Sequence, residues 1–414
     1  MVTDQPHNST ADPFPVPPLA ARIFAIAGAA GHEARIVGGA VRDWLAGHKI
    51  GDIDMAVAAP IDNVAALLRD AGLKVIDTGL DHGTVTVVED GQHLELTQTR
   101  IDVETDGRHA VVAFSDDWAA DAARRDFTIN ALYIDSAGQL EDPLGGQADL
   151  DAGILRFVGT ARQRVEEDAL RMLRYCRFLP RFGGAGTDDA ALAALREQAG
   201  RAAGLSGERI ASEMSRLLSG RGAAVAVGLL QDTGLAGAAL GVTLQSGRLT
   251  PERDQAVAAV FGDDHPAWLV RLAVITRPGD AAGLAVRLRL SRRDSQLLCG
   301  LDADETGNDA DSLTSDRWQQ AAWQLRRADI MPAARLVVAS ARAGRSIDSG
   351  HLARVAGWTP PDFPLTGADL LSQGVDSGPS LGEMLRAAER QWVARDFTPT
   401  RADLLAFLGL DTMG

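Results

Sequence analysis

Residues 34–59, ARIVGGAVRDWLAGHKIGDIDMAVAA, set the expected fold of the first part of the chain. Within them, ARIV predicts a short buried strand, AVRDWLAG predicts a helix and DIDMAVAA predicts a second strand. Because residues i and i+2 of a strand face the same side, Asp52 and Asp54 are expected on one face. Neighbouring carboxylates repel unless a cation lies between them, and Mg²⁺ prefers such oxygen ligands. The pair suggests a metal site, although two solvated acids at a strand end give the same pattern.

Two glycines, Gly38 and Gly39, separate the first strand from the helix. Glycines at this place let backbone N–H groups approach a phosphate, and the start of the helix adds partial positive charge. Arg42 in the first helical turn is then placed to hold a triphosphate oxygen. The alternative is an ordinary tight turn followed by a surface arginine.

A third carboxylate is expected near the aspartates. In HLELTQTR, residues 93–100, polar residues alternate with leucines, so Glu95 lies on the polar face of a strand. If that strand lies beside Asp52 and Asp54, the three acids can hold two metal ions and help to deprotonate an attacking hydroxyl. The alternative is an ion pair between Glu95 and a cation on a neighbouring strand.

A tandem pair of cations, Arg124 and Arg125, precedes the apolar run DFTINAL. Adjacent guanidinium groups are costly without a nearby anion. A nucleotide phosphate is one expected partner, and solvent exposure of both side chains is the alternative.

The segment VEEDALRMLRYCRFLPRF, residues 165–182, predicts one helix that ends near Pro180. Its polar residues Asp168, Arg171, Arg174 and Arg177 recur every third position. An Asp acceptor beside an Arg donor matches the edges of cytosine and adenine and clashes with those of uracil and guanine. The alternative for Asp168 and Arg171 is a surface ion pair at i,i+3.

The composition describes an ordinary globular protein. The 414 residues are 46% hydrophobic and 23% charged, and the formal charge is −15. This balance excludes a largely disordered or fibrous chain; it lowers the expectation of RNA binding, but clustered arginines can still bind phosphate. Cys176 and Cys299 are expected as core thiols in a reducing compartment. No membrane span and no signal peptide are expected, so the predicted location is the cytoplasm.

Five segments resemble, in order, the motifs of the tRNA nucleotidyltransferase (CCA-adding enzyme) and bacterial poly(A) polymerase family: VGGAVRDWLAG, GDIDMA, HLELTQTR, RRDFTINAL and EEDALRMLRYCRF. Residues 206–218 and 365–393 resemble later helical motifs of the family, so the resemblance extends over nearly the whole chain. It implies an α+β fold, with a polymerase-β-like nucleotidyltransferase head and an all-helical remainder. The expected divisions are a flexible leader (1–18), the head (19–153), a neck with the base-reading helix (154–220), a body (221–310) and a tRNA-binding tail (311–414).

The resemblance also implies an activity and roles for residues. The enzyme would add CMP, CMP and AMP from CTP and ATP to the 3′ end of tRNA, by Mg²⁺-dependent attack of the 3′-OH on the α-phosphate. Asp52 and Asp54 would bind the metal, Glu95 would be the third acid, and Asp168 with Arg171 would read the base. The remaining nucleotide contacts would come from Gly38, Gly39, Arg42, Arg125, Arg174 and Arg177.

Further features bear on the branch of the family. RIDVETDGRHA, residues 100–110, resembles the flexible loop that accompanies addition of the final A, which argues against a CC-only enzyme. Poly(A) polymerases usually have a basic, aromatic-containing stretch where residues 75–91 are acidic, so CCA addition is favoured and poly(A) synthesis remains the alternative. Gly51 stands where the family often has lysine. The chain has no His-Asp dipeptide, so no phosphohydrolase is expected, and because both aspartates are present a non-catalytic RNA-binding protein is disfavoured.

Candidate tRNA contacts lie in the helical part: Arg287, Arg289, Arg292 and Arg293, followed by Arg326, Arg327 and Arg335. The alternative is a solvated helix surface. Because only 5% of the residues are aromatic, backbone and shape contacts are expected rather than base stacking.

Overall fold

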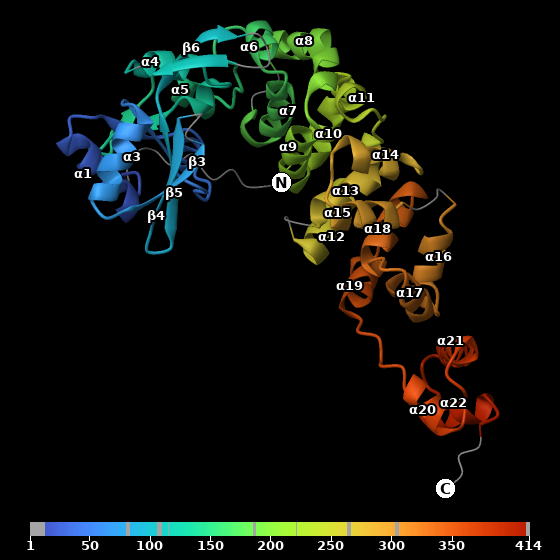
Figure 1. The fold of residues 1–414 in the computed structure, drawn as a ribbon. Helices are drawn as coiled ribbons and strands as arrows, with labels where there is room; N and C mark the ends of the chain where they lie inside the picture. Colours follow the sequence, from blue (N-terminus) through green and yellow to red (C-terminus); the bar gives the residue numbers. More distant parts are fainter. Residues whose placement is uncertain are drawn as a thin grey trace. The chain divides into compact units, whose positions relative to one another are not determined.

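The computed structural model describes residues 13–79, 83–105, 110–114, 116–184, 188–220, 222–262, 266–302 and 306–410, with the backbone alone at 100–105 and 110–114. The chain divides into two compact units, whose elements are labelled in Figure 1. The first unit comprises Met1–Glu213 with Arg221–Leu240, and the second comprises Met214–Gly220 with Gly241–Gly414.

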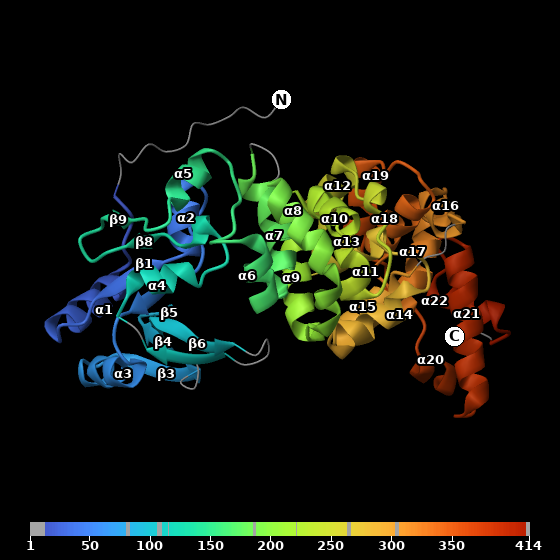
Figure 2. The ribbon, with the colours of Figure 1, turned by 90° about the horizontal axis from the view of Figure 1, so that it is seen from above.

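A seven-stranded sheet in the order β3-β4-β5-β2-β1-β8-β9 organises the start of the first unit. β2 and β5 are parallel, and the other neighbouring strands are antiparallel. Helices α1 (Pro18–Ala29) and α3 (Ile61–Asp70) pack against each other and against the sheet (Figure 2). The strands are β1 (Ala34–Val37), β2 (Asp54–Val57), β3 (Lys74–Gly79), β4 (Thr84–Glu89), β5 (Gln92–Gln98), β8 (Tyr133–Ile134) and β9 (Leu140–Glu141), and a separate hairpin pairs β6 (Arg100–Thr105) with β7 (Ala110–Phe114).

Strands β4 and β5 form a hairpin. Asp90 and Gly91 make its turn with φ of 47° and 78°, the left-handed values that a two-residue hairpin needs. Alternation along β5 buries Leu94 and Leu96 and leaves Glu95 exposed. One face of the sheet is therefore covered, and Glu95 lies on the other.

Strand β2 begins at Asp54, two residues later than the sequence predicts. Its antiparallel partner β1 ends at Val37, which pairs with Asp54. The chain then turns at Gly38, whose φ is 73°, so β1 offers no backbone partner for Asp52. Asp52 lies in the connection before the strand and is exposed, and the expectation that both aspartates share a strand face is wrong for Asp52.

The helix expected over 165–182 is two helices. α6 ends at Glu167 and α7 begins at Leu170, because Asp168 has extended backbone angles and its carboxylate accepts the Leu170 N–H. α7 continues through Pro180 to Phe182. The other helices that begin in the first unit are α2 (Gly39–Leu45), α4 (Trp118–Ala123), α5 (Gly146–Asp151), α8 (Asp189–Gln198), α9 (Gly207–Ser219), α10 (Ala223–Asp232) and α11 (Leu235–Leu240), with α6 starting at Ala161 and 3₁₀ turns η2 (Thr128–Asn130) and η3 (Ala199–Gly204).

Every regular element described in the second unit is helical. The last three helices have a core of their own around Trp392, which is 1% exposed. Cys176 of the first unit is buried as predicted, but Cys299 of α15 is exposed, because it follows the buried Leu298 and is rotated away from it by about 100° around the helix. The helices are α12 (Pro251–Phe261), α13 (Ala267–Ile275), α14 (Asp280–Arg287), α15 (Arg292–Gly300), α16 (Asn308–Thr314), α17 (Trp318–Arg327), α18 (Pro332–Arg342), α19 (Ser349–Gly357), α20 (Gly367–Ser372), α21 (Pro379–Ala394) and α22 (Arg401–Phe407), with the turn η4 (Ser246–Arg248). Across the described parts of the chain, no helix has both the length and the apolar character of a membrane span.

Candidate active site

The acids expected to cooperate lie on adjacent strands. β2 and β5 pair in parallel, and Asp54 is directly opposite Glu95 in the register. Both residues are exposed. The condition that the Glu95 strand lies beside the strand of the aspartates is met for Asp54, and the candidate site is the open face of the sheet where these two strands meet.

Negative charge accumulates at this place. The pKa of Asp54 is raised to about 6, first by loss of hydration and then by repulsion from Glu95 and Asp52. Arg125 acts on Asp54 in the opposite direction. A carboxylate that is hard to ionise because it has lost hydration and lies near two other carboxylates fits a site whose charge a cation would balance.

The acids form an open set of oxygen donors. Among the residues that the structure describes, no three His, Cys, Asp or Glu side chains gather closely enough to enclose a metal ion. Mg²⁺ commonly binds through one or two carboxylates and completes its shell with water and substrate phosphates. Asp52, Asp54 and Glu95 fit that kind of site rather than a closed structural one.

Gly38 lies at the turn beside the acids. Its φ of 73° favours glycine, and a Cβ atom there would lie 3.2 Å from Nη1 of Arg125. Gly39 begins α2. The structure thus brings this glycine turn and Arg125 together.

Arg42 is buried, with 6% of its surface exposed. Its guanidinium donates to Asp43 at 2.8 and 2.9 Å and to Oδ1 of Asn130 at 2.5 Å, and lies over the rings of Phe178 and Phe182. The surface-arginine alternative is therefore wrong. A triphosphate contact by Arg42 stays a prediction, and this geometry gives the residue a structural role between α2 and α7.

The two tandem arginines share an anion. Arg124 and Arg125 both donate to Asp121, a carboxylate that is 0% exposed. Both side chains are half-buried, so the alternative of two fully solvent-exposed arginines is wrong. Asp121 stands three and four residues before them within α4, so helical ion-pair spacing would have identified it from the sequence.

The side chains of the predicted base-reading residues, Asp168 and Arg171, bind other residues and not each other. Oδ2 of Asp168 accepts from Arg209 at 2.8 Å, and Nη1 of Arg171 donates to Glu167 at 2.7 Å. Nη2 of Arg171 donates to the carbonyl of Arg124 at 2.9 Å. The i,i+3 ion pair between Asp168 and Arg171 is wrong, because the break at Asp168 removes the helical geometry on which it depends.

A buried glutamate supports the next two arginines. Glu213 is 3% exposed and accepts from Arg177 at 2.8 Å, with Arg174 at 3.6 Å. Arg174 also donates to Asp126 at 2.6 Å. Glu213 and Arg209 were not identified from the sequence as site residues, although both lie in the segment 206–218.

The predicted RNA contacts lie in the second unit. Arg289, Arg292 and Arg293 are exposed, and Arg287 is half-buried. Arg335 is held by Asp309, whereas Arg326 donates to the carbonyl of Trp358 at 2.9 Å.

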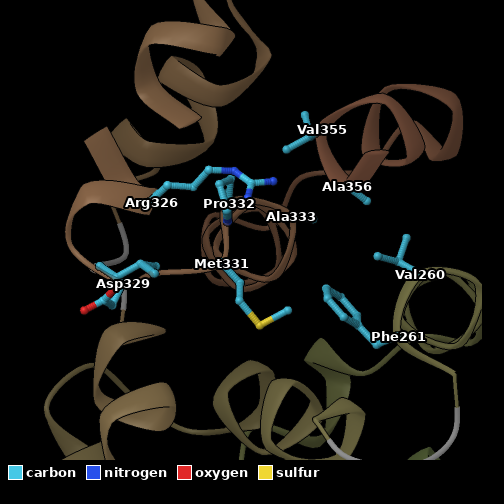
Figure 3. A pocket seen from close by; sticks show the side chains of 10 residues that line it. Val260, Phe261, Arg326, Asp329, Met331, Pro332, Ala333, Val355 and Ala356 are labelled. Carbon is cyan, nitrogen blue, oxygen red and sulfur yellow. The ribbon is translucent and has the colours of Figure 1, made fainter. Parts of the chain in front are cut away.

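Arg326 also crosses a hollow of about 400 Å³ (Figure 3). Its lining from α12, α18 and α19 is apolar and includes Phe261, Met331 and Val355. Asp329 is its one carboxylate among the described lining residues, so the hollow lacks the paired acids of the sheet. RNA contact by these arginines stays a prediction.

Comparison with known proteins gives the family. One family model, described as the poly A polymerase head domain, matches residues 34–156, and another, described as a probable RNA and SrmB-binding site of polymerase A, matches residues 188–240. The chain is 34% identical over 384 residues to the mitochondrial CCA tRNA nucleotidyltransferase 1 of Mus musculus, which covers 91% of this chain and 86% of that protein. The chain belongs to the tRNA nucleotidyltransferase family.

Members of this family with different named products are similar to the chain. The CC-adding tRNA nucleotidyltransferase of Shouchella clausii is 32% identical, over 92% of this chain and 94% of its own. The crystal structure of the Bacillus stearothermophilus CCA-adding enzyme with CTP matches with a TM-score of 0.70 at 28% identity, over 94% and 96% of the two chains. These matches confirm the α+β fold with a polymerase-β-like head and a helical remainder. As a nucleotidyltransferase of this family, the protein is expected to depend on a divalent metal.

Proposed function

We propose that the protein adds CMP, CMP and AMP, from CTP and ATP, to the 3′ end of tRNA without a nucleic-acid template. The observation that supports the site most directly is the register of Asp54 opposite Glu95, next to the turn at Gly38 and to Arg125. Opposed carboxylates beside a guanidinium suit a reaction in which a hydroxyl attacks a phosphate and pyrophosphate leaves.

Mg²⁺ is the cation that we propose, with Asp52 and Asp54 as its protein ligands and Glu95 as the third acid. When bound, it would neutralise phosphate charge and lower the pKa of the attacking hydroxyl. Glu95 would accept the proton of the tRNA 3′-OH as that oxygen attacks the α-phosphate. The turn at Gly38-Gly39, with Arg42 and Arg125, would hold the phosphates and the leaving pyrophosphate.

Asp168 and Arg171 would read the base, with Arg174 and Arg177 supporting it. Among the residues that the structure describes, each oxygen of Asp168 has one donor, which leaves lone pairs for an amino group of cytosine or adenine. Within the same residues, Arg171 uses three of its five N–H donors in hydrogen bonds to Glu167, Arg164 and Arg124. The other two donors would serve N3 of cytosine or N1 of adenine.

The test is addition to tRNA transcripts that end before the CCA, after the first C or after the second C. Each is incubated with all four NTPs and Mg²⁺, and the product ends are sequenced. Ordered CCA ends support the proposal, and long A tails on any RNA would assign poly(A) synthesis instead.

CC addition alone is a second candidate, favoured by the similarity to the Shouchella clausii enzyme. The predicted loop at 100–110 argues for the final A, but residues 106–109 lie outside the described residues, and β6 and β7 are described by backbone alone. Extension of tRNA ending in CC by ATP separates the two candidates.

The remaining proposals concern location and organisation. We retain the cytoplasm as the location, which cell fractionation would test, and the divisions at 18, 153, 220 and 310. Limited proteolysis tests the divisions by locating the first cuts.

A further inference from the structure

A buried carboxylate stands behind the cationic side of the site. Oδ1 of Asp121 accepts from Nε and Nη2 of Arg124 at 2.9 and 2.6 Å. Oδ2 accepts from Nε and Nη2 of Arg125 at 3.2 and 3.0 Å, and from the hydroxyl of Tyr133 at 3.0 Å. Asp121 and Tyr133 are both 0% exposed. One carboxylate thus fixes two guanidinium groups from a position that no substrate can reach.

The charges of this cluster do not cancel. Burial alone would raise the pKa of Asp121, but Arg125 and Arg124 outweigh it and hold the pKa below its usual value. Burial raises the pKa of Tyr133, so its phenol is neutral. Arg124 and Arg125 are cations, Asp121 is an anion and Tyr133 is neutral, so the cluster has a net charge of +1. The hydrogen bonds to Asp121 hold the two guanidinium groups in place.

Arg125 leads from the cluster to the acids. Its Nη1 donates to the carbonyl of Asn130 at 3.2 Å and lies 3.2 Å from where a Cβ of Gly38 would be. Its charge also lowers the pKa of Asp54. The hydroxyl of Tyr133 accepts from Nε of Arg125 at 3.1 Å, so Tyr133 contacts this branch directly.

Arg124 leads to the predicted base-reading residues. It caps α4, and its side chain is tied back to Asp121 one turn earlier. Its carbonyl accepts from Nη2 of Arg171 at 2.9 Å. The described contacts of the Tyr133 hydroxyl are with Asp121 and Arg125, not with this branch.

We propose that Asp121 is a positioning residue for both halves of the site: through Arg125 it orients the phosphate side, and through Arg124 and Arg171 the base-reading side. Tyr133 positions the Arg125 branch alone. The inference rests on the proposed function, because it assigns two substrate contacts to the ends of one network. A purely structural role would affect stability alone, whereas a positioning role predicts changes in KM for CTP with both residues and in base selection with Asp121 only.

The test compares Asp121→Asn and Tyr133→Phe by steady-state addition to tRNA ending in C, with CTP and UTP. Tyr133→Phe should raise KM for CTP by about 3- to 10-fold, with little change in kcat or in CTP over UTP selection. The effect is small because Asp121 and Arg125 each keep other partners when the two hydrogen bonds of the Tyr133 hydroxyl are lost. Asp121→Asn should raise KM for CTP by more than about 10-fold and also lower CTP over UTP selection by about 10-fold. Both effects are expected because Arg124 and Arg125 lose the negative charge that they share.

Two matched controls measure the structural effect. Tyr175→Phe removes the hydroxyl of an equally buried tyrosine in α7, outside the cluster around Asp121. Asp149→Asn weakens the ion pair that another buried carboxylate of the first unit forms with the exposed Arg156. Both should keep KM and base selection at wild-type values, whatever their melting temperatures.

The proposal is overturned if Asp121→Asn and Tyr133→Phe lower Tm or the active fraction while KM and selection stay unchanged, as in the controls. If Asp121→Asn does not fold, a double-mutant cycle of Tyr133→Phe with Arg125→Lys decides, since independent effects on KM overturn the proposal.

If wild type transfers no nucleotide, the proposed function fails. Equilibrium binding of CTP to the same variants then tests the Arg125 branch, and unchanged affinity in Tyr133→Phe overturns it.

Discussion

Replacing Asp54 by asparagine should stabilise the metal-free protein while abolishing nucleotide addition. The pKa of Asp54 is about 6 in the folded protein against an ordinary value of 3.8. The difference of about two pH units corresponds to about 3 kcal/mol, at ~1.4 kcal/mol per unit. Because the residue is exposed, solvent screening reduces the effect, and we expect Asp54→Asn to gain about 1–2 kcal/mol above pH 6.

The pH dependence follows from the direction of the pKa difference. The folded state binds a proton to Asp54 more tightly than the unfolded state does, so ionisation destabilises the fold. The destabilisation is nearly absent below about pH 4, grows as pH rises and is complete above about pH 6. The advantage of Asp54→Asn over wild type should therefore shrink as pH falls from 7.5 towards 4.

Scanning calorimetry in EDTA measures this difference. For a unit of this size, we expect the Tm of Asp54→Asn to exceed that of wild type by about 2–5 °C at pH 7.5. Asp70→Asn, at an exposed position outside the site, is the control and should leave Tm within about 1 °C. Mg²⁺ should raise Tm in wild type more than in Asp54→Asn. If Asp54→Asn is less stable than wild type at both pH 7.5 and pH 4, the reasoning about repulsion among Asp52, Asp54 and Glu95 is refuted.

Three more substitutions test other parts of the site. Glu95→Gln should slow single-turnover addition by about 10²–10⁴-fold with little change in NTP affinity, and an unchanged rate removes Glu95 from the chemistry. Asp168→Ala should reduce CTP over UTP selection, measured as kcat/KM, by about 10- to 100-fold. Unchanged selection would leave Asp168 with only its structural contacts, to the N–H of Leu170 and to Arg209. Glu213→Gln should lower stability by about 3 kcal/mol in thermal unfolding, because it leaves Arg177 half-buried without its carboxylate, and a Tm equal to wild type contradicts that pairing.

Features set by residues close in sequence could be predicted. The turn at Asp90-Gly91 and the alternation along HLELTQTR follow from two-residue turn geometry and strand periodicity, and both occur in the structure. The sequence could not show that the strand of Glu95 lies beside that of Asp54, because α3, β3 and β4 separate β2 from β5 along the chain. It showed only that the acids would meet if the two strands were neighbours. The helical remainder as a whole was predictable from the helical pattern that begins after Ile154, and the resemblance to the family implies the same.

Features set by distant residues could not be predicted. The length of β1, and not the sequence around Asp52, decides where β2 begins. The partner of Asp168 is 41 residues away in α9, and the rings that bury Arg42 are in α7. In each case a charged residue finds its partner through packing between elements, for which local periodicity contains no signal.

The parallel pairing of β2 with β5 determines where residues can be inserted or deleted without loss of activity. The connection between them, residues 58–91, can gain or lose residues at its turns without moving Asp54 or Glu95, because the ladder itself fixes their register. Removing one residue inside the ladder has the opposite effect. Without Leu96, for example, either Glu95 or Thr97 would have to take its place on the covered face of the sheet. Deletion scanning should therefore find a tolerant connection beside an intolerant four-residue ladder, a pattern of tolerated lengths that can be read from growth selections alone.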